Sequence, residues 1–247
     1  MTKALDRVID ACDKKINPGP LLDGIGFVTL VDRMQQDPLL KAVNSARISY
    51  DKQSEELVDK DRKLLKYLLE HGHTSPFRHS YFTFHIKAPL FVFRQWWKYQ
   101  VGSGWCEIQQ STDSGTSWNE VSGRYVEMGE EFYSPAEFRT QGEGQTSEEG
   151  PLEGWTHALY AHSLQVAVRT YRRLLAGGVA KEQARLVLPA SLYSEAYWTV
   201  SLQAIFHFLQ ERQKPSAQWE IQQYARGVRS LVEPFLPENV QECLQPR

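Results

Sequence analysis

Cysteine, long apolar runs and excess charge are all scarce in this chain. Its three cysteines, Cys12, Cys106 and Cys243, are widely separated and form no C-x-x-C pair. This pattern argues against a disulfide framework or a cysteine-based zinc site, and it suits a reducing compartment. No apolar run approaches the roughly 18–20 residues that a helix needs to span a bilayer, and the charged stretch 1–15 lacks the apolar core of a signal peptide. We therefore expect a cytoplasmic protein with no membrane partner.

The charges of the chain nearly cancel, while apolar and aromatic residues are plentiful. With 28 Lys+Arg against 30 Asp+Glu the formal net charge is −2, so no global basic field predicts a nucleic-acid partner. Hydrophobic residues make up 41% of the 247 residues, enough to bury the core of one large domain or two small ones. Aromatic residues reach 12%, and Trp96, Trp97, Trp105 and Trp118 crowd one region. Such flat rings either fill a core or stack on planar ligands.

Strand-like and helix-like segments alternate irregularly along the sequence. β-Branched and aromatic residues predict strands at 26–32, 80–88 and 192–200. Apolar residues at helical spacing predict helices, which are placed at 37–48, 54–72, 90–100 and 202–212 and around Tyr224, Val228, Leu231 and Phe235. The irregular order favours an α+β fold, in which helices pack on a mixed sheet within a single domain.

We expect this domain to span residues 24–236. Residues 1–23 are predicted to be a charged N-terminal leader and residues 237–247 a C-terminal tail. The segments 101–116 and 139–153 are polar and rich in Gly, Ser, Thr or Glu, with little to bury, which predicts two loop insertions.

A long helix is predicted after the second insertion. Trp155, Leu159, His162 and Val166 share one face of it at helical spacing. An apolar face of this kind predicts contact with the core, and a histidine on it is more typical of a satisfied core residue than of a metal ligand.

The stretch TSWNEVSGRY at 116–125 concentrates hydrogen-bonding side chains around one glycine. Arg124 follows Ser122 and Gly123, so an unhindered backbone could approach an anion that the guanidinium grips. Arg185, in ARLVLP, and Arg212, at the end of a predicted helix, place further guanidiniums next to apolar runs. Such arginines suit a phosphate joined to a planar heterocycle. The alternative is that they form surface or structural ion pairs.

Two further polar patterns are weaker. Gln203, His207 and Glu211 form a stripe at i, i+4 and i+8 of one predicted helix, which either faces solvent or faces a ligand. The histidines of HGHTSPFRH, at positions 71, 73 and 79, lack the nearby carboxylate or thiolate that zinc and iron sites usually use. A metal-dependent hydrolase built on them is the least favoured hypothesis, and we expect no metal site.

The string WNEVSGRY resembles the signature of flavin-dependent thymidylate synthases, in which N-E-x-S-x-R-Y follows an arginine-rich triplet. HGHTSPFRH is similar to the H-x-x-x-P-F-x-H segment of that family, and FTFHIKAPLFVFRQW to the strand and helix before its triplet. ARLVLPASLYSEAYWTV and AQWEIQQYA resemble its C-terminal blocks. These blocks occur in the family's order and cover roughly residues 24–235 apart from the two insertions, which makes the resemblance far more specific than one motif.

The resemblance implies a homotetramer whose active sites lie at subunit interfaces and bind FAD, dUMP, NADPH and methylenetetrahydrofolate. The implied reaction methylates uracil C5, giving dTMP and tetrahydrofolate. It implies a catalytic role for Arg212, which would stabilise charge on the uracil ring. The positions implied for dUMP are Gln95, Trp96, Trp97, Lys98, Glu120, Val121, Ser122, Gly123, Arg124, Arg185 and Arg212. The positions implied for FAD are Ser75, Lys98, Tyr99, Gln100, Glu120, Ser201, Gln203, His207 and Glu211.

The chain departs from the family pattern at three places. Lys98, Tyr99 and Gln100 stand where the Arg-His-Arg triplet is usual, and residues 101–116 intervene before the signature. Position 78 is Arg where Glu is frequent. Lys98 keeps one positive charge of the triplet without the bidentate fork of arginine. A non-catalytic nucleotide-binding or flavin-binding relative therefore stands as the alternative to the enzyme.

Overall fold

A computed structural model of the protein describes residues 19–99, 117–141, 147–148 and 154–244. Its strands are β1 (Phe27–Arg33), β2 (Tyr81–Pro89), β3 (Ser117–Glu120), β4 (Thr140–Gln141), β5 (Ser147–Glu148) and β6 (Tyr193–Ser201). Its α-helices are α2 (Pro38–Arg47), α3 (Asp59–Glu70), α4 (Leu90–Trp96), α5 (Trp155–Ala176), α6 (Lys181–Ala184), α7 (Leu202–Arg212), α8 (Trp219–Val232) and α9 (Glu238–Gln241). Short 3₁₀ helices are η1 (Ile48–Tyr50), η2 (Ser75–His79), η3 (Trp97–Tyr99), η4 (Arg185–Val187), η5 (Glu233–Phe235) and η6 (Glu242–Leu244).

The main sheet has four strands in the order β1-β2-β6-β3, and every neighbouring pair is antiparallel. The α+β class predicted from the sequence is confirmed, but the sheet is antiparallel where a mixed sheet was expected. An antiparallel sheet needs apolar cover on one face only, and that is the arrangement here. The longest pairing joins β2 to β6 along nine residues of each strand.

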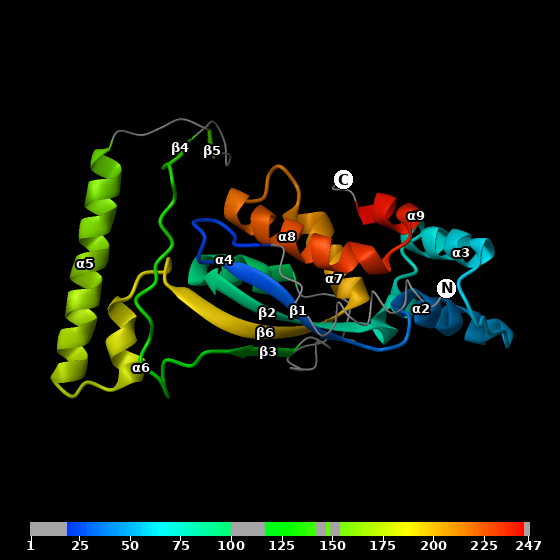
Figure 1. Ribbon diagram of the computed structural model, residues 1–247, viewed down its shortest axis with the longest axis horizontal. Helices are drawn as coiled ribbons and strands as arrows, with labels where there is room; N and C mark the ends of the chain where they lie inside the picture. Colours follow the sequence, from blue (N-terminus) through cyan, green and yellow to red (C-terminus); the bar gives the residue numbers. More distant parts are fainter. Residues whose placement is uncertain (1–18, 100–116, 142–146, 149–153, 245–247) are drawn as a thin grey trace.

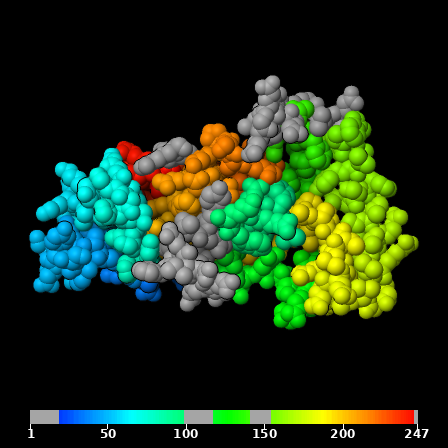
Figure 2. Space-filling model, turned by 180° about the vertical axis from the view of Figure 1, so that it is seen from behind, coloured from blue at the N-terminus to red at the C-terminus, as the bar shows by residue number. Residues whose placement is uncertain are grey.

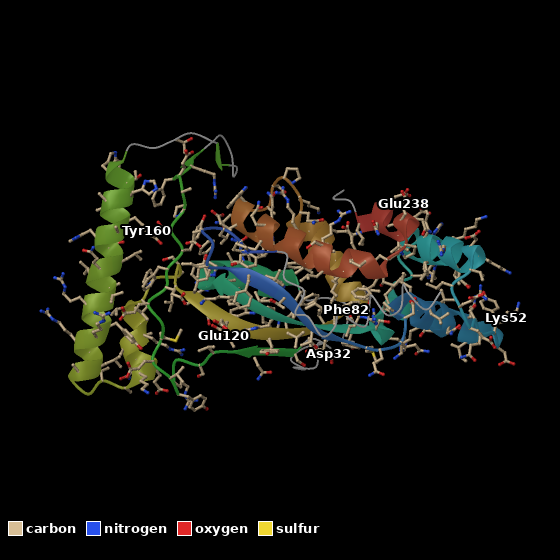
Figure 3. All side chains as sticks on the ribbon, viewed as in Figure 1. Asp32, Lys52, Phe82, Glu120, Tyr160 and Glu238 are labelled. Atoms are coloured by element: carbon tan, nitrogen blue, oxygen red, sulfur yellow. The ribbon has the colours of Figure 1, made fainter. Side chains whose placement is uncertain are left out.

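One face of the sheet forms the core. Along β2, Phe82, Phe84, Ile86 and Ala88 alternate with partly exposed residues and are fully or almost fully buried. This alternation follows from the two-residue repeat of a strand. Helices α4, α7 and α8 cover the apolar face (Figure 1), and Phe82 lies on the side of the sheet that faces them (Figure 3).

Trp96 is at the centre of this contact. Its ring stacks on Phe208 of α7 at 4.6 Å and meets Trp198 of β6 edge-on at 5.2 Å. Trp118 of β3 stacks in turn on Trp198 at 5.7 Å. Of the two uses considered for the tryptophans, core packing is the one that Trp96 and Trp118 show, whereas Trp97 is 39% exposed.

The sequence signals at the helix starts explain where two helices begin. The Asp37 side chain accepts hydrogen bonds from the backbone N–H groups of Leu39 and Leu40, at 2.8 and 3.0 Å, and Pro38 occupies the first turn of α2. The Ser201 hydroxyl likewise accepts from Ala204 N–H at 3.3 Å and caps α7. Both helices agree with the predicted segments.

Helix α5 is present as predicted, but its apolar face does not lie against the core of this chain. Trp155, Leu159 and Val166 are 61%, 59% and 46% exposed, and His162 is exposed as well, so the expectation of a buried core histidine is wrong for the single chain. Periodicity shows that a helix has an apolar face but not what covers it. From the opposite side, α5 forms one edge of the molecule with α6 beside it (Figure 2). Among the described helices, none is both long and apolar enough to cross a bilayer.

The segments expected at the margins of the domain are partly described. Residues 238–244 of the predicted tail form α9 and η6, and they bury Val240 and Leu244 in the core. The described parts of the second insertion form the short pair β4–β5. Residues 1–18 of the leader, all of the insertion 101–116, and Cys12 and Cys106 lie outside the described residues. The Cys243 thiol donates a hydrogen bond to the Asn239 carbonyl at 3.5 Å.

The packing of β1 against α8 leads to a first prediction. A Cβ added to Gly26 would overlap the hydroxyl of Tyr224, which donates a hydrogen bond to the Lys87 carbonyl at 2.8 Å. We expect Gly26→Ala to lower the free energy of unfolding by about 1–3 kcal/mol, the usual cost of overpacking. Denaturant unfolding at fixed protein concentration measures it. Gly129→Ala is the control, because an added Cβ there meets no atom within 4 Å. Equal stability of the two variants would contradict this packing.

Candidate functional site

The polar signature begins on an edge strand. Its first residues form β3, which pairs with β6 at the edge of the sheet. No strand was predicted here, because the polarity of the segment reflects this edge position. The Ser194 hydroxyl donates to Glu120 Oε1 at 2.8 Å, and Val121 N–H donates to the Glu195 carbonyl at 2.9 Å. Glu120 thus lies beside β6 (Figure 3). The chain then turns, with Tyr125 N–H donating to the Ser122 carbonyl at 3.0 Å.

Gly123 brings this turn against Arg185. A Cβ added to Gly123 would lie 2.8 Å from both Arg185 Cδ and Met128 Sδ, so any other residue here would push one of these side chains aside. Arg124 extends from the same turn to Glu182 of α6, with Nε 2.9 Å from Oε2. Both of those side chains are largely exposed, which makes the ion pair weak and easily exchanged for another anion. We call Glu120, Val121, Ser122, Gly123, Arg124 and Arg185 the signature cluster.

A second group surrounds Arg212 at the C-terminal end of α7. This arginine is only 9% exposed, and its Nη2 donates to the Gln95 carbonyl at 2.8 Å. Gln95 in turn donates through Nε2 to Gln218 Oε1. Trp96 follows Gln95 but buries its ring in the core, so only its backbone could contact a ligand. Trp97 and Lys98 continue into η3 and are exposed. We call Gln95, Arg212 and Gln218 the Arg212 cluster.

A third group joins η2 to the start of α7. Arg78 Nε donates to Gln203 Oε1 at 2.5 Å, and Gln203 Nε2 donates to Thr74 Oγ1 at 2.7 Å. Ser75 is exposed on η2, whereas Ser201 is fully buried and uses its hydroxyl to cap α7. We call Thr74, Ser75, Arg78, Gln203, His207 and Glu211 the η2–α7 cluster. It contains the whole polar stripe predicted on this helix.

The charges in the η2–α7 cluster are set by burial and by one ion pair. Burial lowers the pKa of His207 from its ordinary value of 6.5; the charge of Glu211 acts the other way, and those of Lys214 and Arg212 add to the lowering. His207 is therefore neutral near pH 7. Glu211 is engaged with Lys214, whose Nζ lies 2.7 Å from Oε1.

Two predicted sets of residues stand apart from these clusters. Gln100 lies outside the described residues, and Tyr99 is described only in its backbone. His71 and His73 both stack on Tyr67, at 4.0 and 6.2 Å between ring centroids. Within the described residues no three side chains of His, Cys, Asp or Glu converge on a common point that could hold a metal ion. The hydrolase hypothesis thus finds no support in this arrangement.

Arg78 is the residue that the sequence assignment missed. It was seen only as a departure from a family pattern, yet its guanidinium contacts Gln203, one of the positions expected to contact FAD. A contact between residues 125 positions apart is invisible to spacing rules, so the unusual residue type was the only signal.

Together these clusters have the chemistry that suits an anionic ligand with a planar ring. Guanidiniums stand at a glycine backbone and at a helix end, and amide side chains stand beside them. The chain belongs to the flavin-dependent thymidylate synthase family. The family model described as "Thymidylate synthase complementing protein" matches residues 29–238.

Its relatives support the same family assignment. The flavin-dependent thymidylate synthase of Thermus thermophilus is 44% identical over 220 residues, which cover 88% of this chain and 75% of that protein. The enzyme of the same name from Thermotoga neapolitana is 41% identical over 212 residues, which cover 86% of this chain and 87% of that protein. Crystal structures of a UMP/dUMP methylase, PolB from Streptomyces cacaoi, bound with 5-Br UMP or 5-Br dUMP, are 30% identical. They superpose with TM-scores of 0.71 and 0.72 and cover 88% of this chain and 92% and 93% of theirs.

The burial of His207 leads to a second prediction. Because its pKa is lower in the folded chain than in the unfolded chain, the unfolded chain binds the proton more readily, and the free energy of unfolding must fall as the pH drops below about 6.5. His207→Gln removes this proton uptake, so its stability should change less between about pH 7 and pH 5. Denaturant unfolding at several pH values tests this. The exposed His79→Gln is the control, and an unchanged pH slope in His207→Gln would contradict the prediction.

Proposed function

We propose that this protein is a flavin-dependent thymidylate synthase that converts dUMP to dTMP. The observation that carries the proposal is the buried guanidinium of Arg212, held by the Gln95 carbonyl at the end of the helix that bears the polar stripe. The names of the relatives are those of enzymes, which favours catalysis over a non-catalytic relative.

The complete reaction balances with two cosubstrates. Methylenetetrahydrofolate, dUMP, NADPH and a proton give dTMP, tetrahydrofolate and NADP⁺. Bound FAD would carry the hydride that completes the methyl group. The residues present fit such a group: the η2–α7 cluster offers hydroxyl, amide, imidazole and guanidinium side chains, and the guanidinium of Arg78 has nitrogens beyond the Nε that donates to Gln203. These are the donors that a diphosphate and an isoalloxazine ring require.

Different side chains of this protein would bind the phosphate of dUMP and stabilise charge on its uracil ring. Arg124 and Arg185 are placed to bind its phosphate, because Gly123 lets the backbone approach alongside them. Ser122 is a binding residue in this proposal, since no described side chain stands beside it as a general base. Arg212 is placed to stabilise negative charge that builds on the uracil ring when C5 attacks. A fixed cation in a buried position needs no reorganisation at that moment, which lowers the barrier.

The assembly proposed is a homotetramer with shared sites, working in the cytoplasm. Two observations support it. The exposed apolar face of α5 is typical of a surface covered by another subunit. Arg124 of the signature cluster contacts Glu182 of α6, whereas α7 lies over the sheet (Figure 1), so neighbouring subunits would bring the two together. The scarcity of cysteine supports the compartment.

The role of Arg212 leads to a third prediction. Arg212→Ala should lower turnover by a factor of about 10² or more, the scale of losing one preorganised charge contact, while FAD remains bound. Formation of dTMP and the visible flavin spectrum measure the two properties. Arg226→Ala, an exposed arginine of α8, is the control for general loss of charge. Arg212→Lys tests whether the loss of turnover in Arg212→Ala comes from impaired folding, because the lysine keeps the buried positive charge. Near-normal turnover of Arg212→Ala would refute the role.

A shared site leads to a fourth prediction. Arg124→Ala and Arg212→Ala chains, coexpressed with different tags and purified as mixed oligomers, should regain activity up to roughly one quarter of wild type, because random mixing of two chains makes that share of two-chain sites intact. Thymidylate formation per site is the measurement. Oligomers of Arg212→Ala chains carrying both tags are the control. Mixed oligomers as inactive as either parent would show that each site lies within one chain.

A further inference from the structure

The η2–α7 cluster contains one cation whose charge is not balanced. Arg78 is half-buried on η2, and among the described residues its hydrogen-bond partner is Gln203, which accepts from Nε. It forms no ion pair within the described part of the chain. Its Nη1 and Nη2 groups therefore keep four donors that no described side chain uses.

The neighbours of Arg78 do not supply an anion. Glu211 is the carboxylate of the cluster, and it is already paired with Lys214 at 2.7 Å. His207 is neutral near pH 7 because burial lowers its pKa. Counted together with the adjoining Lys214, these side chains have one positive charge more than they have negative charges. Partly burying a guanidinium without an anion costs free energy, which indicates that the anion comes from a ligand.

The guanidinium is also held in place. Thr74 accepts from Gln203 Nε2 at 2.7 Å, and Gln203 accepts from Arg78 Nε at 2.5 Å, so two hydrogen bonds in series fix the plane of the side chain. This leaves the edge with the Nη groups for a bidentate contact, the geometry in which arginine binds phosphate. A lysine in this position would offer a point charge without the fork.

We propose that Arg78 binds the diphosphate of FAD. The inference rests on the proposed function, which assigns Ser75, Gln203, His207 and Glu211 around it to the flavin. It also accounts for the triplet positions, where Lys98 keeps a single cation. Arg78 restores a guanidinium to the cofactor site from a different part of the chain.

The test compares flavins that have or lack phosphate. Full-length protein freed of flavin is titrated with FAD and with riboflavin, and the quenching of flavin fluorescence gives each Kd. Arg78→Gln should raise the Kd for FAD about tenfold or more and leave the Kd for riboflavin unchanged, because only FAD offers phosphate oxygens. The Kd of Arg78→Lys for FAD should lie between those of the wild type and of Arg78→Gln, because lysine keeps the charge without the fork. Arg62→Gln, at an exposed position of α3, is the matched control.

Each other outcome overturns the inference in a recognisable way. An equal loss of affinity for FAD and riboflavin would mean that Arg78 only holds Gln203. An unchanged Kd for FAD with weaker binding of dUMP would assign Arg78 to the nucleotide phosphate. An unchanged Kd for both ligands would leave Arg78 no binding role. Failure of the wild-type protein to bind FAD would overturn the proposed function as well, which separates that result from a failure seen in Arg78→Gln alone.

Discussion

The contact of Trp96 with Phe208 and Trp198 determines how the rest of the molecule is arranged. These three rings join α4, α7 and β6 at 4.6 and 5.2 Å, and aromatic pairs of this kind contribute about 0.5–1.5 kcal/mol beyond the area they bury. Gln95 precedes Trp96 on α4, and Arg212 follows Phe208 by one helical turn on α7. The packing of the rings therefore brings the Gln95 carbonyl to the guanidinium of Arg212. The guanidinium of Arg212 is thus held in one orientation, because the packed rings of Trp96 and Phe208 fix α4 and α7 relative to each other.

The same one-sided core separates the polar residues into groups of different character. Arg212 lies behind α4 and is almost buried, whereas Arg124 projects from an edge turn and pairs with an exposed carboxylate. The first is suited to stabilise charge in a dry site, and the second to capture a phosphate from water. Arg78 stands between these extremes, half-buried and held by Gln203. In the proposed assembly, neighbouring subunits complete each site, and the exposed apolar face of α5 provides a surface for that contact.

Secondary structure could be predicted from the sequence wherever the spacing of apolar residues within one segment shows which of its side chains are buried. The alternation in β2 and the helical spacing in α7 placed a strand and a helix correctly, since a two-residue repeat and a 3.6-residue repeat bury different sets of side chains. The polar stripe of Gln203, His207 and Glu211 was also correctly located. The β3 strand was missed because its polarity reflects an edge position, which depends on the order of strands. The apolar face of α5 was expected to contact the core but is exposed, because helical periodicity does not show which surface covers an apolar face.

The α+β class, the family with its ordered blocks, and the residue types at the proposed sites could be read from the sequence, because each of these is a local property of the chain. The antiparallel order of the sheet, the place of Trp96 in the core and the contact of Arg78 with Gln203 became known from the folded chain alone. Those facts depend on contacts between residues far apart in the chain. Such contacts arise because the apolar faces of β2, β6, α4, α7 and α8 must be buried together, and that requirement belongs to the whole chain and to no single segment.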